Sequence, residues 1–466
     1  MKPNRLVPAA FSLLSVLLVG AATGPAFAAA TPRPPNIIVI LSDDQGYADF
    51  SFNPHHPKEV STPHLDALAR ASVFFSQGYI SGNVCSPTRA GMLTGRYQQR
   101  AGVYTAGEGG RGIAQSEKIF PRFLQPAGYV TGAFGKWHLG LTVEQGPIGR
   151  GFDESYGFLG RGGHDYLKLD DIEGSPLYRG RQPIKDQGYL TTRLTEETVA
   201  FIQKHKARPF YIHLAYNAVH APAQAPAEDI ARYRKQFPDL PENRVILMAM
   251  LHHLDLGVGR VVETLKKENL WENTLLFFLT DNGGSKAMGA NNAPLRGAKQ
   301  QNYEGGIRTP FIVSWPARFK GGRTIDTPVV SLDLLPTALA AAGVAPPTDR
   351  PFDGKNLLGL LTGETRSHHE NLFWSEGGSS GEWAVRSGNW KLVAAPDKKE
   401  LFDLAADPTE TKDLAAQQVQ KIAELTRLYE TWLDQMAEPM DGVGKRWKKS
   451  TEPTTKQKKK KQQAVK

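Results

Sequence analysis

Four short, mainly apolar runs recur along the chain, the first of them rich in β-branched residues, and polar residues follow each of the first three closely. The runs cover residues 36–41, 210–215, 274–280 and 311–315. Continuous apolar runs of this length are typical of strands buried on both faces of a sheet. The residues that follow the first three runs are Asp43 and Asp44, Asn217 and His220, and Asp281 and Asn282.

Stretches with helical periodicity lie between these strands, at residues 62–71, 192–206, 245–267 and 332–342. Alternating strands and helices predict an α/β fold with a large, mostly parallel or mixed sheet flanked by helices. In such sheets, ligand sites lie beyond the carboxyl ends of the strands. The three polar clusters are therefore predicted to form one site.

The composition changes after residues 345–347. Residues 383–386, 390–394 and 400–403 are interpreted as short strands of an antiparallel sheet, and residues 409–433 as a final helical region. We therefore expect a catalytic domain over residues 32–344, followed by a smaller α+β subdomain, an antiparallel sheet plus a helix, over residues 345–440.

Both ends of the chain are predicted to lie outside these domains. Residues 1–28 combine a short basic start, an apolar stretch and a small-residue cleavage pattern, as a signal peptide does. No later stretch is interpreted as a transmembrane span. The mature protein is expected to be exported, either to a periplasm or to the outside of the cell.

The formal net charge is +9, and residues 445–466 carry ten lysines or arginines and one glutamate. The folded part is therefore near neutral, and nucleic acid is not expected as a partner. Residues 441–466 are interpreted as a basic disordered tail. A solvated end is the favoured interpretation of this tail, and weak contact with an anionic glycan or membrane surface is the alternative.

The chain contains a single cysteine, Cys85. Cysteines of exported proteins usually pair, and a lone one is buried and inert, linked to another chain, or reactive. The surrounding residues 83–96 (NVCSPTRAGMLTGR) decide between these possibilities. Their Cys-x-Pro-x-Arg sequence, followed by Leu-Thr-Gly-Arg, resembles the signature of the type I sulfatases in the alkaline-phosphatase-like superfamily.

Other segments resemble the same family in the same order along the chain. They are residues 42–47, 135–140, 220–222, 280–283, 295–299, 304–308, 400–404 and 407–410. The resemblance implies that a maturation enzyme oxidises Cys85 to formylglycine. A hydrated aldehyde offers two hydroxyl groups on one carbon, one to attack sulfur and one to release the bound sulfate.

The same resemblance implies the roles of further residues. Lys136 and Lys299 would contact sulfate, Arg89 would hold residue 85, His138 would act as base and His220 would protonate the leaving alcohol. Asp43, Asp44, Asp281 and Asn282 are hard oxygen ligands, which suit calcium or magnesium better than zinc. The family points to one Ca²⁺ ion, with residue 85 completing its coordination.

Other polar residues carry weaker signals. The adjacent histidine pairs 252–253 and 368–369 are interpreted as surface or packing residues, because neighbours in sequence do not share a helix face. Residues 160–166 (GRGGHDY) are interpreted either as the lining of a substrate pocket or as a structural loop.

The predicted activity is hydrolysis of sulfate monoesters, with a sulfated carbohydrate or polysaccharide as the expected substrate. Two alternatives remain open from the sequence. One is a phosphonate monoester or phosphodiester hydrolase of the same superfamily, and the other is an inactive protein that binds sulfated glycans.

Overall fold

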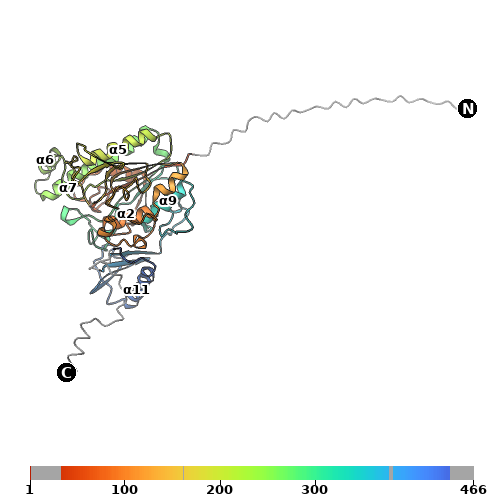
Figure 1. Ribbon diagram of the computed structural model, residues 1–466. Coiled ribbons are helices and arrows are strands. Elements are labelled where there is room, and N and C mark those ends of the chain that lie inside the picture. The colour runs from red at the N-terminus through yellow and green to blue at the C-terminus, as the bar shows by residue number, and fades with distance from the viewer. Residues whose placement is uncertain (2–32, 161, 377–380, 441–466) are drawn as a thin grey trace, which may run out of the picture. The chain divides into compact units, whose positions relative to one another are not determined.

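Ten strands form the central sheet of the computed structural model, in the order β11-β2-β10-β9-β1-β8-β4-β5-β6-β7 (Figure 1). The structure describes residue 1 and residues 33–160, 162–376 and 381–440. The strands are β1 (Asn36–Ser42), β2 (Val73–Phe75), β4 (Val130–Lys136), β5 (Glu154–Phe158), β6 (Leu177–Arg179), β7 (Gln182–Ile184), β8 (Phe210–Ala215), β9 (Thr274–Thr280), β10 (Ile312–Ser314) and β11 (Arg323–Ile325).

The middle of this sheet is parallel. Strands β9, β1, β8, β4 and β5 pair side by side in one direction, whereas β10, β6 and β7 pair antiparallel to their neighbours. The predicted large mixed sheet is therefore confirmed. Because the central strands run the same way, the residues after β1, β4, β8 and β9 emerge at one edge.

Helices cover both faces of the sheet, so every residue of β1 is buried. Ile37, Val39 and Leu41 face one apolar core, and Ile38 and Ile40 face the other. This alternation explains why the strand is apolar throughout. The second core contains residues of α1 (Pro63–Ala71), α5 (Leu190–His205), α6 (Ala227–Gln236) and α7 (Glu242–Lys267).

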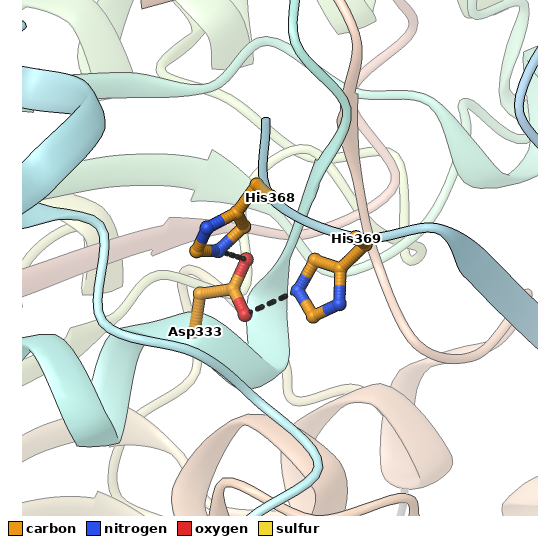
Figure 2. A group of neighbouring side chains, drawn as sticks. All are labelled: Asp333, His368 and His369. Carbon is orange, nitrogen blue, oxygen red and sulfur yellow. Dashed lines mark hydrogen bonds and ion pairs between the residues drawn. The ribbon is translucent and has the colours of Figure 1, made fainter. Parts of the chain in front are cut away.

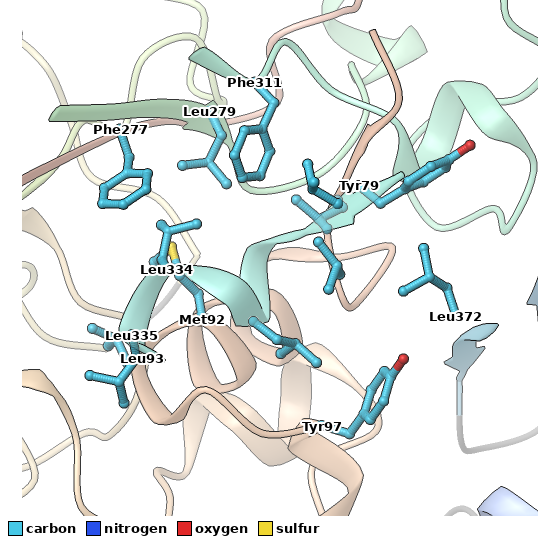
Figure 3. Packing of buried hydrophobic residues seen from close by; sticks show 14 of the residues in the cluster. Tyr79, Met92, Leu93, Tyr97, Phe277, Leu279, Phe311, Leu334, Leu335 and Leu372 are labelled. Carbon is cyan, nitrogen blue, oxygen red and sulfur yellow. The ribbon is translucent and has the colours of Figure 1, made fainter. Parts of the chain in front are cut away.

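The first core contains residues of α2 (Cys85–Thr94), α4 (Phe120–Leu124) and α9 (Leu334–Ala341). Figure 3 shows Met92 and Leu93 of α2 near Leu334 and Leu335 of α9, with Phe277 of β9 also in the cluster. The helix that begins with Cys85 is thus anchored by its apolar residues against the rest of the core.

Helix α7 differs from the sequence expectation, because it is long and apolar enough to cross a membrane by length and composition alone. In the described structure, however, 67% of its most apolar stretch is buried. The helix packs against α5, α6 and α1. Helix α7 is therefore apolar because it is a core helix, buried between the sheet and its neighbouring helices.

A second, antiparallel sheet follows in the chain, in the order β13-β14-β15-β16. Its strands are β13 (Asn371–Ser375), β14 (Trp383–Ser387), β15 (Trp390–Ala395) and β16 (Lys398–Asp403), and helix α11 (Val419–Leu433) packs against it. The predicted antiparallel sheet with a helix is confirmed, but β13 was not predicted. Residues 409–418, predicted as helical, are not helical. The side chains of Asp407 and Asp413 accept hydrogen bonds from the backbone N–H groups of Lys412 and Ala415 in the turns here.

The remaining elements are short. They are β3 (Gly78–Tyr79) paired with β12 (Val329–Val330), and helices α3 (Ala106–Gly110), α8 (Glu304–Ile307) and α10 (Leu358–Thr362). Residues 34–440 belong to one compact unit where they are described. The predicted signal peptide, apart from Met1, and the predicted basic tail lie outside the described residues.

A buried charge network connects the second sheet to helix α8, which precedes it in the chain. Lys391 Nζ of β15 lies 2.8 Å from Glu304 Oε1 of α8 and 2.8 Å from Glu410 Oε1, and all three side chains are fully buried. Tyr79 donates a hydrogen bond of 2.7 Å to the other oxygen of Glu304. Burial raises the pKa of Glu410 to about 7 despite the attraction of Lys391. One lysine therefore does not keep both carboxyl groups fully ionised.

We expect Lys391→Met to lower the free energy of unfolding by about 3–5 kcal/mol, because it leaves Glu410 buried without its cation and removes the nearer of two ion-pair partners of Glu304. Lys412→Met is the matched control, since Lys412 is exposed and should change stability by less than about 0.5 kcal/mol. Denaturant and thermal unfolding of both variants test this. Equal stability of the two variants would contradict the role given to Lys391.

Candidate active site

Residues from three strand ends meet at the carboxyl edge of the central sheet. Asp43 and Asp44 follow the end of β1, Asp281 and Asn282 follow β9, and Lys136 is the last residue of β4. Asn282 Nδ2 donates a 2.7 Å hydrogen bond to Asp44 Oδ1, which joins the two acidic turns. Four of the five predicted metal ligands, those with oxygen atoms, are therefore brought together, and all four side chains are buried.

Three cationic side chains contact these carboxylates. Lys136 Nζ lies 2.5 Å from Asp43 Oδ2, and Lys299 Nζ lies 2.7 and 2.9 Å from the two oxygens of Asp44. Arg89 donates two hydrogen bonds, of 3.0 and 2.8 Å, to Asp281 Oδ2. Carboxylates and cations that leave water together must be paired in this way.

Cys85 and Arg89 are one turn apart on α2, which places them on the same side of the helix. Cys85 is only 3% exposed. Burial raises the pKa of its thiol, and Asp281 and Asp43 add to the effect against Lys136 and Lys299. An unmodified Cys85 is thus held as a thiol, the less nucleophilic form of the side chain.

His138 lies just beyond β4 in a left-handed backbone conformation, with φ of 55°. Its ring is buried, and burial together with Lys136 and Arg89 lowers the pKa of His138 to about 2. The ring is therefore neutral in ordinary conditions and can accept a proton.

His220 follows β8 and is partly open to solvent. Its Nδ1 lies 2.7 Å from the carbonyl oxygen of Ala221, which can only accept a hydrogen bond, so Nδ1 carries a proton. Its Nε2 lies 3.9 Å from Asp44 Oδ2. This tautomer leaves Nε2 as the atom that can exchange a proton at the site.

The loop at residues 162–166 lies beside both histidines. A Cβ atom at Gly162 would lie 3.5 Å from His138 Cε1 and 3.8 Å from His220 Nε2. The Tyr166 hydroxyl lies 2.5 Å from the carbonyl oxygen of Asn217 and 2.9 Å from that of His220. The loop thus lies beside both histidine rings, and its Tyr166 hydroxyl holds the backbone of the segment that carries His220.

The acidic turns suit a hard cation. Asp43 Oδ1 and Asn282 Oδ1 are buried, and neither has a hydrogen-bond partner among the described residues. Buried oxygen acceptors without donors are costly, and a cation would satisfy them. The atoms of Asp43, Asp44 and His220 also lie within 4.8 Å of one another. The oxygen-rich set fits Ca²⁺ or Mg²⁺ better than zinc.

Asn217 is a polar residue of the site that sequence reasoning noted only as the residue after a strand. Both atoms of its side-chain amide are buried without a hydrogen-bond partner in the described structure. Its neighbour Ala218 accepts a 2.9 Å hydrogen bond from the backbone N–H of Asp43. The signal that could have marked it is its position two residues after β8, a strand that is buried throughout.

The mixed sheet and the charged site at its carboxyl edge define a hydrolase of the alkaline-phosphatase-like superfamily. The sequence model of the sulfatase family matches residues 35–344, and that of the C-terminal region of N-sulphoglucosamine sulphohydrolase matches residues 298–438. The chain belongs to the sulfatase family, and it is a sulfuric ester hydrolase.

Individual relatives agree with this assignment. The chain is 35% identical to N-acetylgalactosamine-6-sulfatase of Canis lupus familiaris over 75% of this chain and 70% of the relative. It is 33% identical to the uncharacterized sulfatase YdeN of Escherichia coli (strain K12), over 74% of this chain and 69% of the relative.

Among solved structures, Ps i-CgsB in complex with k-i-k-neocarrahexaose is similar at a TM-score of 0.82 and 33% identity, covering 93% of this chain and 98% of that one. The phosphonate monoester hydrolase SpPMH from Silicibacter pomeroyi has a TM-score of 0.64 at 22% identity, over 86% of this chain and 94% of that one. The second likeness shows a shared fold alone.

Tyr166→Phe is expected to lower the free energy of unfolding by about 1–3 kcal/mol and to lower kcat, because the carbonyls of Asn217 and His220 lose their donor. Tyr211→Phe is the matched control. The hydroxyl of Tyr211 is equally buried but makes no hydrogen bond within the described residues. Unfolding curves and steady-state kinetics of both variants test this, and equal kcat values would contradict the positioning role of Tyr166.

Proposed function

We propose that the chain hydrolyses sulfate monoesters through a formylglycine made from Cys85, at a calcium site formed by Asp43, Asp44, Asp281 and Asn282 with residue 85. The observation that carries this proposal is the convergence of buried acidic and cationic side chains around α2. Arg89, Lys136 and Lys299 each lie within 3.0 Å of one of the three carboxylates.

The metal would supply positive charge next to the sulfate oxygens and to residue 85. Its ligands would be the oxygens of the two acidic turns, two of which have no hydrogen-bond partner among the described residues. Calcium is favoured over zinc because the four side chains offer only oxygen atoms.

The lysines and the arginine balance the charge of the substrate. A sulfate monoester is an anion, and its negative charge shifts toward the leaving oxygen as the bond to sulfur breaks. Lys136 and Lys299 are held rigidly at the carboxylates and need little reorganisation to bind sulfate oxygens. Arg89 shares one helix with residue 85, so it orients the nucleophile from one turn away.

The two histidines divide the proton transfers. His220 carries a proton on Nδ1 and, when protonated on Nε2 as well, donates that second proton to the leaving alcohol. His138 is neutral because burial and nearby cations disfavour its charged form. Its neutral ring has a lone pair for the proton of the remaining hydroxyl of residue 85, and the negative charge of bound sulfate would offset the cations that lower its pKa. This proton transfer lets sulfate depart and restores the aldehyde.

The proposed substrate is a sulfated carbohydrate. The names of the relatives support this, because one is a sulfatase of N-acetylgalactosamine and one similar structure was determined with a neocarrahexaose. A phosphonate monoester or phosphodiester hydrolase is the alternative, which only a likeness of fold favours. Relative kcat/KM on an aryl sulfate and an aryl phosphodiester separates the two, and a preference for the phosphodiester would reject our proposal.

We also propose that the protein acts outside the cytoplasm after removal of residues 1–28, with a catalytic domain to residue 344 and a C-terminal subdomain to residue 440. The ends of the two matched family regions, at residues 344 and 438, support these domain boundaries. A maturation enzyme would act on Cys85.

Peptide mass spectrometry across residue 85 tests the nucleophile directly. In active protein we expect the peptide to have lost one sulfur and two hydrogens and gained one oxygen, as conversion of a thiol to an aldehyde requires. Cys85→Ser is the informative variant, because serine can be sulfated but lacks the second hydroxyl. It should accumulate a sulfated peptide with little turnover, whereas full activity with an unmodified thiol would refute the mechanism.

His220→Ala should slow hydrolysis in proportion to how poor the leaving group is. For a sugar sulfate we expect kcat to fall about 10²–10⁴-fold, as loss of a general acid does, and for a nitrophenyl sulfate much less. The two substrates serve as controls for each other, because a folding defect would lower both rates equally. An equal loss on both substrates would remove His220 from the role of acid.

A further inference from the structure

A second group of potential metal ligands lies outside the catalytic residues. His368 and His369, which precede β13, both point at the carboxylate of Asp333 (Figure 2). His369 Nε2 lies 2.7 Å from Asp333 Oδ1, and His368 Nε2 lies 3.2 Å from Asp333 Oδ2. The side chains are 0%, 5% and 6% exposed for Asp333, His368 and His369. Sequence reasoning treated the two histidines as surface or packing residues and did not foresee this convergence.

The hydrogen bonds of this cluster leave one nitrogen atom unused. Asp333 Oδ2 accepts a 2.9 Å bond from the backbone N–H of Val330, and Oδ1 accepts 2.7 Å bonds from the backbone N–H of Lys355 and from His369. His368 Nε2 is buried beside Oδ2 but makes no hydrogen bond within the described residues. A buried imidazole nitrogen without a hydrogen-bond partner is costly, and coordination to a metal ion would satisfy it.

The charge of the cluster also suits a cation. The nearby Lys355 amine is turned away from the Asp333 carboxylate, since its Nζ donates a 2.7 Å hydrogen bond to the carbonyl oxygen of His368. The carboxylate thus faces two imidazoles rather than a fixed cation.

We propose that Asp333, His368 and His369 bind one divalent transition-metal ion of the zinc class. Two imidazole nitrogens and a carboxylate oxygen are the ligands that zinc prefers, whereas calcium prefers oxygen alone. This ion is distinct from the proposed catalytic calcium, because none of its ligands belongs to the acidic turns. Binding displaces the proton that His369 shares with Asp333 and coordinates the unused nitrogen of His368.

The proposed ion has a structural consequence for the active site. Asp333 ends the short helix η5 (Ser331–Asp333) and leads into α9. Ser331 Oγ accepts a 3.1 Å hydrogen bond from the backbone N–H of Ser81, four residues before Cys85, and both η5 and α9 pack against α2. The metal would therefore fasten the segment before β13 to the surface that supports the nucleophile helix.

Metal titration of the untagged full chain tests the proposal, with excess calcium present to occupy the catalytic turns. Wild-type protein should bind one more equivalent of Co²⁺ or Zn²⁺ than the His368→Gln/His369→Gln double variant, and Zn²⁺ should raise the Tm of wild type but not that of this double variant. His252→Gln/His253→Gln is the matched control, an adjacent pair on α7, and it should behave as wild type. Equal stoichiometry in all three proteins would overturn the proposal and leave the cluster hydrogen-bonded only.

X-ray absorption at the zinc edge of the wild-type protein keeps the proposal testable if the double variant does not fold. We expect two imidazole nitrogens in the coordination shell. In the described structure the catalytic acidic cluster has a single histidine, His220. A shell with one imidazole or none would place the ion elsewhere and reject the site.

Discussion

The whole catalytic edge depends on one constraint, the mutual neutralisation of charges that have been removed from water. Asp43, Asp281, Arg89 and Lys136 are all at most 1% exposed. The direction of the central strands brings carboxylates of two turns to one edge, and each carboxylate would be prohibitively costly there alone. The cations come from three other segments, so the site exists only when distant parts of the chain have packed.

Because the buried charges must stay paired, the segments that carry them must be held in fixed positions. Arg89 can meet Asp281 only if α2 keeps its position, and α2 is held by the apolar core it shares with α9 and β9 (Figure 3). The backbone also accepts unusual conformations at the site. Asp44 and His138 both have positive φ values, which non-glycine residues adopt at a cost that the surrounding contacts must offset.

Much of the fold and of the site could be predicted from the sequence, because the apolar runs of β1, β8 and β9 and the residues after them are local signals. Strand β4 was missed since Gly132 and Gly135 interrupt its apolar pattern; a Cβ at Gly135 would lie 2.0 Å from the carbonyl oxygen of Ala215 in the adjacent strand. The convergence of His368 and His369 on Asp333 could not be predicted, because it joins residues more than thirty positions apart through packing alone.

The second sheet takes part in the site without contributing a ligand to the acidic turns. Its buried Lys391 contacts Glu304, the first residue of α8. Gly306 of α8 accepts a 3.0 Å backbone hydrogen bond from Gly283, the residue after Asn282. Gly283 leaves no space for a side chain, because a Cβ there would lie 1.9 Å from the carbonyl oxygen of Gly305. A charge buried in the C-terminal sheet therefore fixes the helix against which the second acidic turn is packed, so the geometry of the active site depends on both sheets.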